Sequence, residues 1–103
     1  MSTMYDRLSD LERRYEELTE QLSDPAIATD PTRLMQIGSE RAELEDVVTA
    51  FRELNAVESQ VQEINQLIRD ETDSEMVELA QEELGELHSN REVLTDRLRR
   101  LLV

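Results

Sequence analysis

One histidine and several pairs of carboxylates are the side chains in this sequence best suited to chemistry. His88 is the single imidazole, and the chain contains no cysteine. Glu12 and Glu16 are four residues apart, as are Glu78 and Glu82, so each pair shares one side of a helix. Paired carboxylates perform acid–base catalysis where burial separates their pKa values. Both pairs lie in polar surroundings, so we expect solvated surface charge.

His88 is also a poor candidate for a metal ligand. Zinc sites and di-iron sites in helical bundles usually need further imidazoles or thiolates, or a Glu three residues before the histidine, whereas that position is Gly85. We interpret His88 as a surface residue. The sequence therefore predicts no catalytic residue, no cofactor-binding residue, no metal ligand and no cofactor.

The composition limits the kinds of partner. The net charge is −14, all 11 cations are Arg, and 35% of the 103 residues are charged. Such a surface repels nucleic acid and anionic membranes, so we expect protein partners. No apolar run approaches the length of a membrane span, and residues 1–7 lack a signal-peptide core. The absence of cysteine fits a cytoplasmic location.

Apolar residues recur every three or four positions and predict helices at about 4–22, 31–70 and 74–102. Short connections make such helices antiparallel. The predicted fold is therefore all-α: an elongated antiparallel three-helix bundle or coiled coil, with one long central helix and a projecting two-helix arm. We expect residues 1–103 to form one domain. The predicted common core, where all three helices overlap near residues 42–52, contains Leu8, Leu11, Leu44, Val47, Val48, Phe51, Leu94, Leu98 and Leu101.

Helix-capping residues predict where these helices begin. Thr3 with Asp6 resembles a capping box, and Asp30 followed by proline is a strong start signal. Thr72 with Glu75, or Ser74 alone, could cap the last helix. Residues 23–30 are predicted to form a loop.

The predicted pairing gives specific contacts. Tyr15 is expected beside Gly38, whose missing side chain would make room for the ring, and Met76 is expected in the seam opposite Ile68. On the surface, Asp10 should pair with Arg14, and Asp96 with Arg100.

Charge is unevenly distributed along the arm. Residues 70–90 contain eight acids and no Arg, whereas residues 91–103 contain four Arg and two acids. The acidic tip at residues 70–86 could steer the chain toward a basic protein. A simpler interpretation, which we favour, is a solvated end kept soluble by its charge.

Several segments resemble bacterial class-I peptide chain release factors. They are Tyr15-Glu-Glu-Leu18, Leu22-Ser-Asp-Pro25, Asp30-Pro31 and Gly38-Ser-Glu-Arg-Ala-Glu-Leu44-Glu-Asp-Val-Val48. Glu75-Met-Val-Glu-Leu-Ala-Gln-Glu-Glu-Leu84 and the ending Leu101-Leu-Val103 are similar to the release factor 1 branch of the family. The resemblance covers essentially the whole chain, and the order and spacing of the segments make it specific to the N-terminal helical domain.

The resemblance implies a role in translation termination. Complete members recognise the stop codons UAA and UAG on the ribosome and promote hydrolysis of peptidyl-tRNA through a Gly-Gly-Gln loop. Their N-terminal domain is associated with the stalk base of the large ribosomal subunit and with a GTPase release factor. Here Gly38 and Gly85 are isolated and no stop-codon tripeptide is present, so no residue of release chemistry carries over. We expect the chain to be cut before those domains, because its apolar end lacks a helix-stop signal.

Two other classes of function remain open. A free-standing coiled-coil scaffold, which could associate weakly with itself, would show the same apolar stripes. A metal or acid–base enzyme is the least favoured class, because the sequence has a lone His88 and no cysteine.

Overall fold

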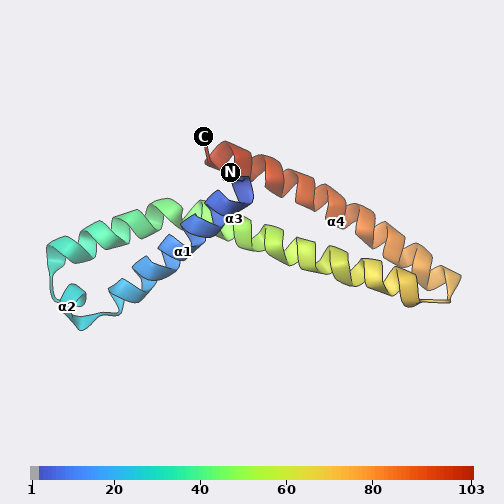
Figure 1. The fold of residues 1–103 in the computed structure, drawn as a ribbon, viewed down its shortest axis with the longest axis horizontal. Helices are drawn as coiled ribbons and strands as arrows, with labels where there is room; N and C mark the ends of the chain where they lie inside the picture. The colour runs from blue at the N-terminus through green and yellow to red at the C-terminus, as the bar shows by residue number, and fades with distance from the viewer. Residues whose placement is uncertain (1–2) are drawn as a thin grey trace. The chain divides into compact units, whose positions relative to one another are not determined.

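Helices account for nearly all of the computed structural model, which describes residues 3–103 (Figure 1). Within this part the elements are α1 (Met4–Leu22), α2 (Pro25–Ala28), α3 (Pro31–Asp70) and α4 (Ser74–Leu101), and no strand occurs among the residues described. The all-α class is confirmed, and so is the long central helix. With 40 residues, α3 is about 60 Å long at 1.5 Å per residue.

The capping residues explain why the helices begin where they do. The Thr3 hydroxyl accepts a hydrogen bond from the Asp6 amide at 3.1 Å, and the Asp6 carboxylate accepts one from the Thr3 amide at 3.2 Å. This reciprocal capping box is the one predicted for α1. Asp30 accepts a hydrogen bond from the Arg33 amide at 3.3 Å, as expected of the residue that precedes Pro31 and caps α3.

Residues 23–30 were predicted to form a loop, and this prediction is wrong in part. Pro25–Ala28 form the single helical turn α2. The Asp24 carboxylate caps it by accepting a hydrogen bond from the Ala26 amide at 2.9 Å, and Pro25 supplies the helical φ angle at the first position. Ile27 is buried, which gives this turn an apolar anchor.

The cap of α4 also differs from the prediction. Asp73, rather than Thr72 or Ser74, is the N-cap, and its carboxylate accepts a hydrogen bond from the Glu75 amide at 3.0 Å. Glu71 accepts from the amides of Thr72 and Asp73 at 3.1 and 3.0 Å. The Glu71 carboxylate therefore satisfies two amides of the turn between α3 and α4, and the Asp73 carboxylate satisfies an amide in the first turn of α4.

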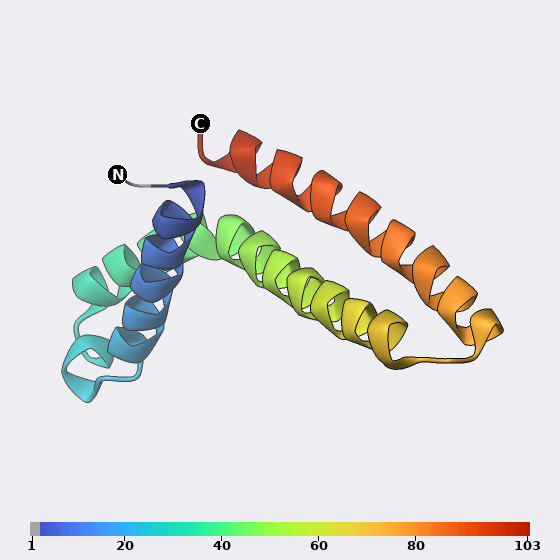
Figure 2. The same ribbon diagram turned by 45° about the vertical axis from the view of Figure 1, so that its right-hand side comes forward.

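The chain divides into two compact units, one ending at Thr49 and the other beginning at Ala50. In the first unit, α1 lies beside the first half of α3, as Figures 1 and 2 both show. The buried apolar residues of this unit are Leu8, Leu18, Ile27, Val47 and Val48.

The second unit is an antiparallel pair formed by the rest of α3 and by α4 (Figures 1 and 2). Its buried cluster consists of Val57, Val61 and Leu87, and the partly buried Ile64, Leu84 and Leu94 pack against it. We call these six residues the apolar seam. They are four and three residues apart along α3, and three and seven residues apart along α4, as in a coiled coil.

Two residues predicted to be buried are exposed instead. Met76 is 45% exposed and Leu101 is 40% exposed. At the start of α4 the half-buried position is Val77, one residue later than predicted. The stripe of α4 therefore continues from Ala80 back to Val77 at a spacing of three, and Met76 lies at its edge. The overlap of three helices near residues 42–52 stays a prediction.

Candidate functional site

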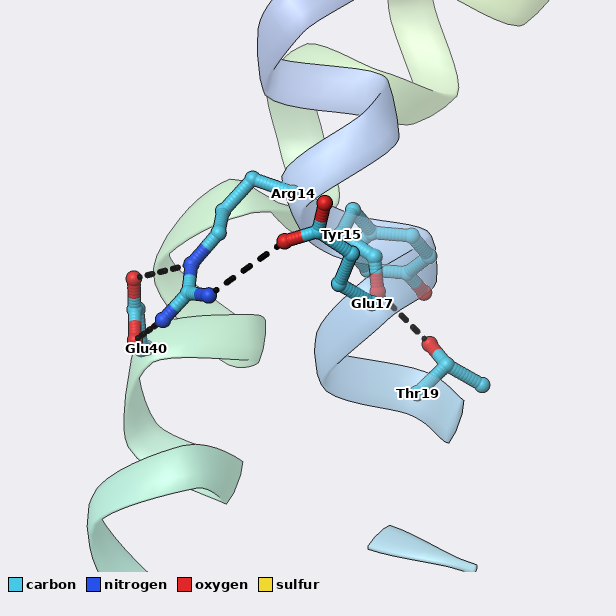
Figure 3. Close-up of polar contacts among 5 residues, drawn as sticks. All are labelled: Arg14, Tyr15, Glu17, Thr19 and Glu40. Atoms are coloured by element: carbon cyan, nitrogen blue, oxygen red, sulfur yellow. Dashed lines mark hydrogen bonds and ion pairs between the residues drawn. The ribbon is translucent and has the colours of Figure 1, made fainter. Parts of the chain in front are cut away.

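A polar cluster joins α1 to the first half of α3. The Arg14 guanidinium donates two hydrogen bonds to Glu40, from Nε to Oε1 and from Nη2 to Oε2, each at 2.9 Å (Figure 3). This two-pronged arrangement matches the planar fork of arginine to the two oxygens of a carboxylate. Arg14 Nη1 also lies 3.5 Å from Glu17 Oε2 on the next turn of α1.

A second set of contacts adjoins this ion pair. The guanidinium carbon of Arg41 lies 4.5 Å from the centroid of the Tyr15 ring, a cation–π distance. Arg41 Nε donates to the Thr19 hydroxyl at 2.8 Å. That hydroxyl donates to the Tyr15 carbonyl at 2.9 Å (Figure 3). We call Arg14, Tyr15, Thr19, Glu40 and Arg41 together the polar clasp.

The ion pair of the clasp shifts the pKa of both partners. The hydrogen bond to Glu40 raises the pKa of Arg14 above its ordinary value, and Glu17 adds to this effect. The hydrogen bond from Arg14 lowers the pKa of Glu40. Both side chains are a little over 40% exposed. Both shifts favour the charged forms, which suits the joining of two helices better than proton transfer.

Gly38 does not have the role predicted for it. A side-chain carbon built at this position would meet nothing within 4 Å, and the same is true at Gly85. Tyr15 instead faces Arg41, nearly one helical turn further along α3. The prediction that Tyr15 packs on Gly38 is wrong, because the ring is covered by a flexible cation.

The surface ion pairs also differ from the predicted ones. Asp10 pairs with Arg13 at 3.3 Å, and Asp96 pairs with Arg99 at 3.0 Å. Both pairs span three residues rather than the predicted four. The cross-helix pair between Arg91 of α4 and Glu58 of α3, at 3.5 Å, was not predicted.

His88 and the paired carboxylates do not form a shared site in the described part of the chain. His88 is exposed on α4 and lines a surface hollow with Arg91, Glu92 and Thr95. Glu78 and Glu82 are exposed on α4, and Glu16 is exposed on α1 beside the half-buried Glu12. Among residues 3–103, no three His, Asp or Glu side chains gather in a way that could hold a metal ion.

The acids near the α3–α4 turn lie on the surface. Seven of the eight are exposed, and Glu71 is half-buried and bonded to the turn amides. No helix of the described part of the chain is long and apolar enough to cross a membrane.

The clasp was missed because its signal in the sequence is weak. Arg41 lies four residues after Ile37 and three before Leu44, so it shares their side of the helix, and an arginine on an apolar stripe is a sign that a polar partner faces it. Tyr15, one of two tyrosines, was the available ring. The choice of Glu40 for Arg14 depends on the exact register of the two helices, which spacing does not give.

The fold defines an all-α helical domain, and comparison with known proteins gives its family. A model of the PCRF domain matches residues 11–103. The chain belongs to the PCRF domain family.

Its relatives include several proteins named Peptide chain release factor 1. The chain is 41% identical to that of Enterococcus faecalis, 42% to that of Listeria welshimeri and 40% to that of Bacillus thuringiensis, in each case over 100 residues. Each match covers 97% of this chain and 28% of the relative, so the chain spans little more than a quarter of those proteins. The resemblance noted from the sequence is confirmed. No solved structure matches the chain.

Proposed function

We propose that this chain is the protein-interaction domain of a translation-termination factor and has no catalytic role of its own. The observation that carries the proposal is the 40–42% identity to Peptide chain release factor 1 across nearly the whole chain. In the proposed parent protein, other domains recognise the stop codons UAA and UAG and promote hydrolysis of peptidyl-tRNA on the ribosome. This domain contributes protein and ribosome contacts only.

The proposal that this domain has no catalytic role is supported by its residues. The glycines stand alone at positions 38 and 85, so this stretch contains no Gly-Gly-Gln loop. His88 and three of the four paired carboxylates are exposed, Glu12 is half-buried, and their arrangement does not suit acid–base work. The proposal therefore includes no cofactor and no metal.

The proposed partners are the stalk base of the large ribosomal subunit and the GTPase release factor. A surface with a net charge of −14 favours proteins with basic patches and disfavours direct contact with nucleic acid or a membrane. We place this function in the cytoplasm, where ribosomes work.

Binding measurements on the chain test the proposal. The chain, attached to a sensor surface, is presented with ribosomes, with purified stalk-base protein and with the GTPase release factor. We expect binding to at least one of the three that weakens as salt rises, because charge contributes to the contact. Failure to bind any of them would reject the proposal.

Sedimentation of the chain alone separates this function from the scaffold alternative. Self-association is the alternative because apolar residues on α4 are exposed, such as Leu79 at 60% and Val93 at 66%. Dimers at micromolar concentration, combined with no ribosome binding, would favour the scaffold.

A further inference from the structure

A groove runs between α3 and α4 on one face of the hairpin in the second unit. Its lining residues come from both helices, so the sides of α3 and α4 that carry them form one face of the hairpin. We call this face the outer face. The groove is lined by Glu53, Ala56 and Val57 of α3, and by Asn90, Val93, Leu94 and Arg97 of α4.

The outer face extends toward the turn between the helices. Leu67 follows Ala56 by eleven residues, and Leu79 precedes Asn90 by eleven. Eleven residues make about three helical turns, so both leucines share the side of their helix that lines the groove. Met76, three residues before Leu79, stands at the edge of the same side.

Apolar exposure is concentrated on this face. Leu67 is 37% exposed, Met76 45%, Leu79 60% and Val93 66%. Apart from residues 101 and 103 at the end of the chain, these are the only large hydrophobic side chains of residues 50–103 that are exposed. Polar residues lie on the same face, among them Glu63 and Glu83, and exposed apolar side chains rimmed by polar residues mark an interaction surface.

The surrounding charge identifies the kind of occupant. Exposed Glu63 lies one turn before Leu67, and exposed Glu83 lies one turn after Leu79. Between residues 70 and 90 there is no Arg to balance the acids. An occupant must therefore bring apolar side chains to the leucines and cations to the acids. A second copy of this chain would bring further acids to this end of the face.

We propose that the outer face of the α3–α4 hairpin docks a basic amphipathic helix of another protein. The apolar side of that helix covers Leu67, Met76 and Leu79, and its Arg or Lys residues meet Glu63 and Glu83. The amphipathic helix is recognised by exposed apolar side chains, with acids at the rim that fix its orientation. The inference deepens the proposed function, because it assigns the protein contact to one surface.

A synthetic peptide of about five helical turns tests this surface directly. It carries Leu at helical spacing on one side and Arg on the other, and a matched peptide has Glu in place of Arg. We expect the Arg peptide to bind the chain and the Glu peptide not to bind. The double variant Met76→Gln, Leu79→Gln should bind the Arg peptide about tenfold more weakly, because two apolar contacts are lost.

Met35→Gln is the matched control. Met35 is 76% exposed but lies on α3 in the other unit, so the same substitution there should leave peptide affinity unchanged. All the substituted side chains are exposed, and circular dichroism verifies that helix content is kept. The Arg peptide should also perturb NMR signals on the outer face rather than those of the first unit.

Four results would overturn the inference. They are no binding of the Arg peptide, equal affinity of the double variant and wild type, an equal loss in Met35→Gln, and a dimer of the chain that dissociates on the double substitution. Ribosome binding by the wild-type chain is measured separately. If it fails while the peptide still distinguishes the variants, the proposed function is wrong and the docking surface stands.

Discussion

The two halves of α3 are held to their neighbours in different ways. The first half meets the middle of α1 through the polar clasp, with Arg14 on Glu40 and Arg41 over Tyr15. The second half meets α4 through the apolar seam, where Val61 and Leu87 are buried. Both halves also bury apolar residues, and Arg91 pairs with Glu58 in the second, but the two-pronged ion pair belongs to the first half.

The clasp and the seam contribute differently to the register of the helices and to the stability of the fold. A two-pronged bond requires both nitrogens of Arg14 to reach both oxygens of Glu40, so it fixes how α1 lies along α3. A half-exposed ion pair adds little free energy, however. The seam places fewer geometric demands on α4, yet each buried aliphatic side chain contributes substantially to folding. We infer that the clasp sets alignment and the seam holds its unit together.

The largest predicted effect is that of truncating the seam. Leu87 is 7% exposed, and Leu87→Ala should lower the free energy of unfolding by about 2–5 kcal/mol, since it removes buried apolar surface and leaves a cavity. Urea unfolding followed by circular dichroism measures the change.

Leu79→Ala is the matched control for this prediction. It is the same substitution on the same helix, but Leu79 is 60% exposed. Its effect should stay within about 0.5 kcal/mol. Equal losses in the two variants would mean that burial in the seam does not stabilise the second unit.

Much of this fold was predictable from local signals. The spacing of apolar residues predicts helices, and Thr3 with Asp6 and Asp30 before proline mark two of their starts. The short helix α2 could have been found too, because Asp24–Pro25 repeats the signal of Asp30–Pro31. Its four residues are too few to show a periodic pattern, so only the capping signal Asp24–Pro25 indicates a helix there.

The contacts between helices were less predictable. Counting back from a turn places Tyr15 beside Gly38, but α2 occupies part of that connection and the ring faces Arg41 instead. Met76 was predicted in the seam from its spacing of four before Ala80, but the half-buried residue in the structure is Val77, at a spacing of three. Sequence spacing gives the face of a helix to within about one position, and partner choice needs three-dimensional register.

The next predicted effect, smaller than that of Leu87→Ala, is a gain in stability on substitution of Gly38. No atom would obstruct a side-chain carbon there, and Gly in a helix interior is about 1 kcal/mol less favourable than Ala. Gly38→Ala should therefore stabilise the chain by about 0.5–1 kcal/mol in urea unfolding. Gly85→Ala, equally unobstructed on α4, should do the same in the other unit. A loss of stability in Gly38→Ala alone would show that the clasp needs space at this position.

The smallest effect is the pH dependence of the clasp. Arg14 lowers the pKa of Glu40 in the folded chain, so the ion pair stabilises folding at pH values above the ordinary pKa of Glu. That contribution is lost as the pH falls through the lowered pKa of Glu40. The melting temperature of wild type should therefore exceed that of Glu40→Gln near pH 7, and the difference should shrink toward about pH 3.

Removing a carboxylate also relieves repulsion in a chain with a net charge of −14, and this opposes the loss of the ion pair. Glu82→Gln removes the same charge from an exposed position on α4, outside the clasp. Subtracting its effect leaves the part that belongs to Arg14 and Glu40. If the corrected difference in melting temperature is the same at both pH values, the Arg14–Glu40 ion pair makes no charge-dependent contribution to stability. The clasp would then align α1 through its geometry alone.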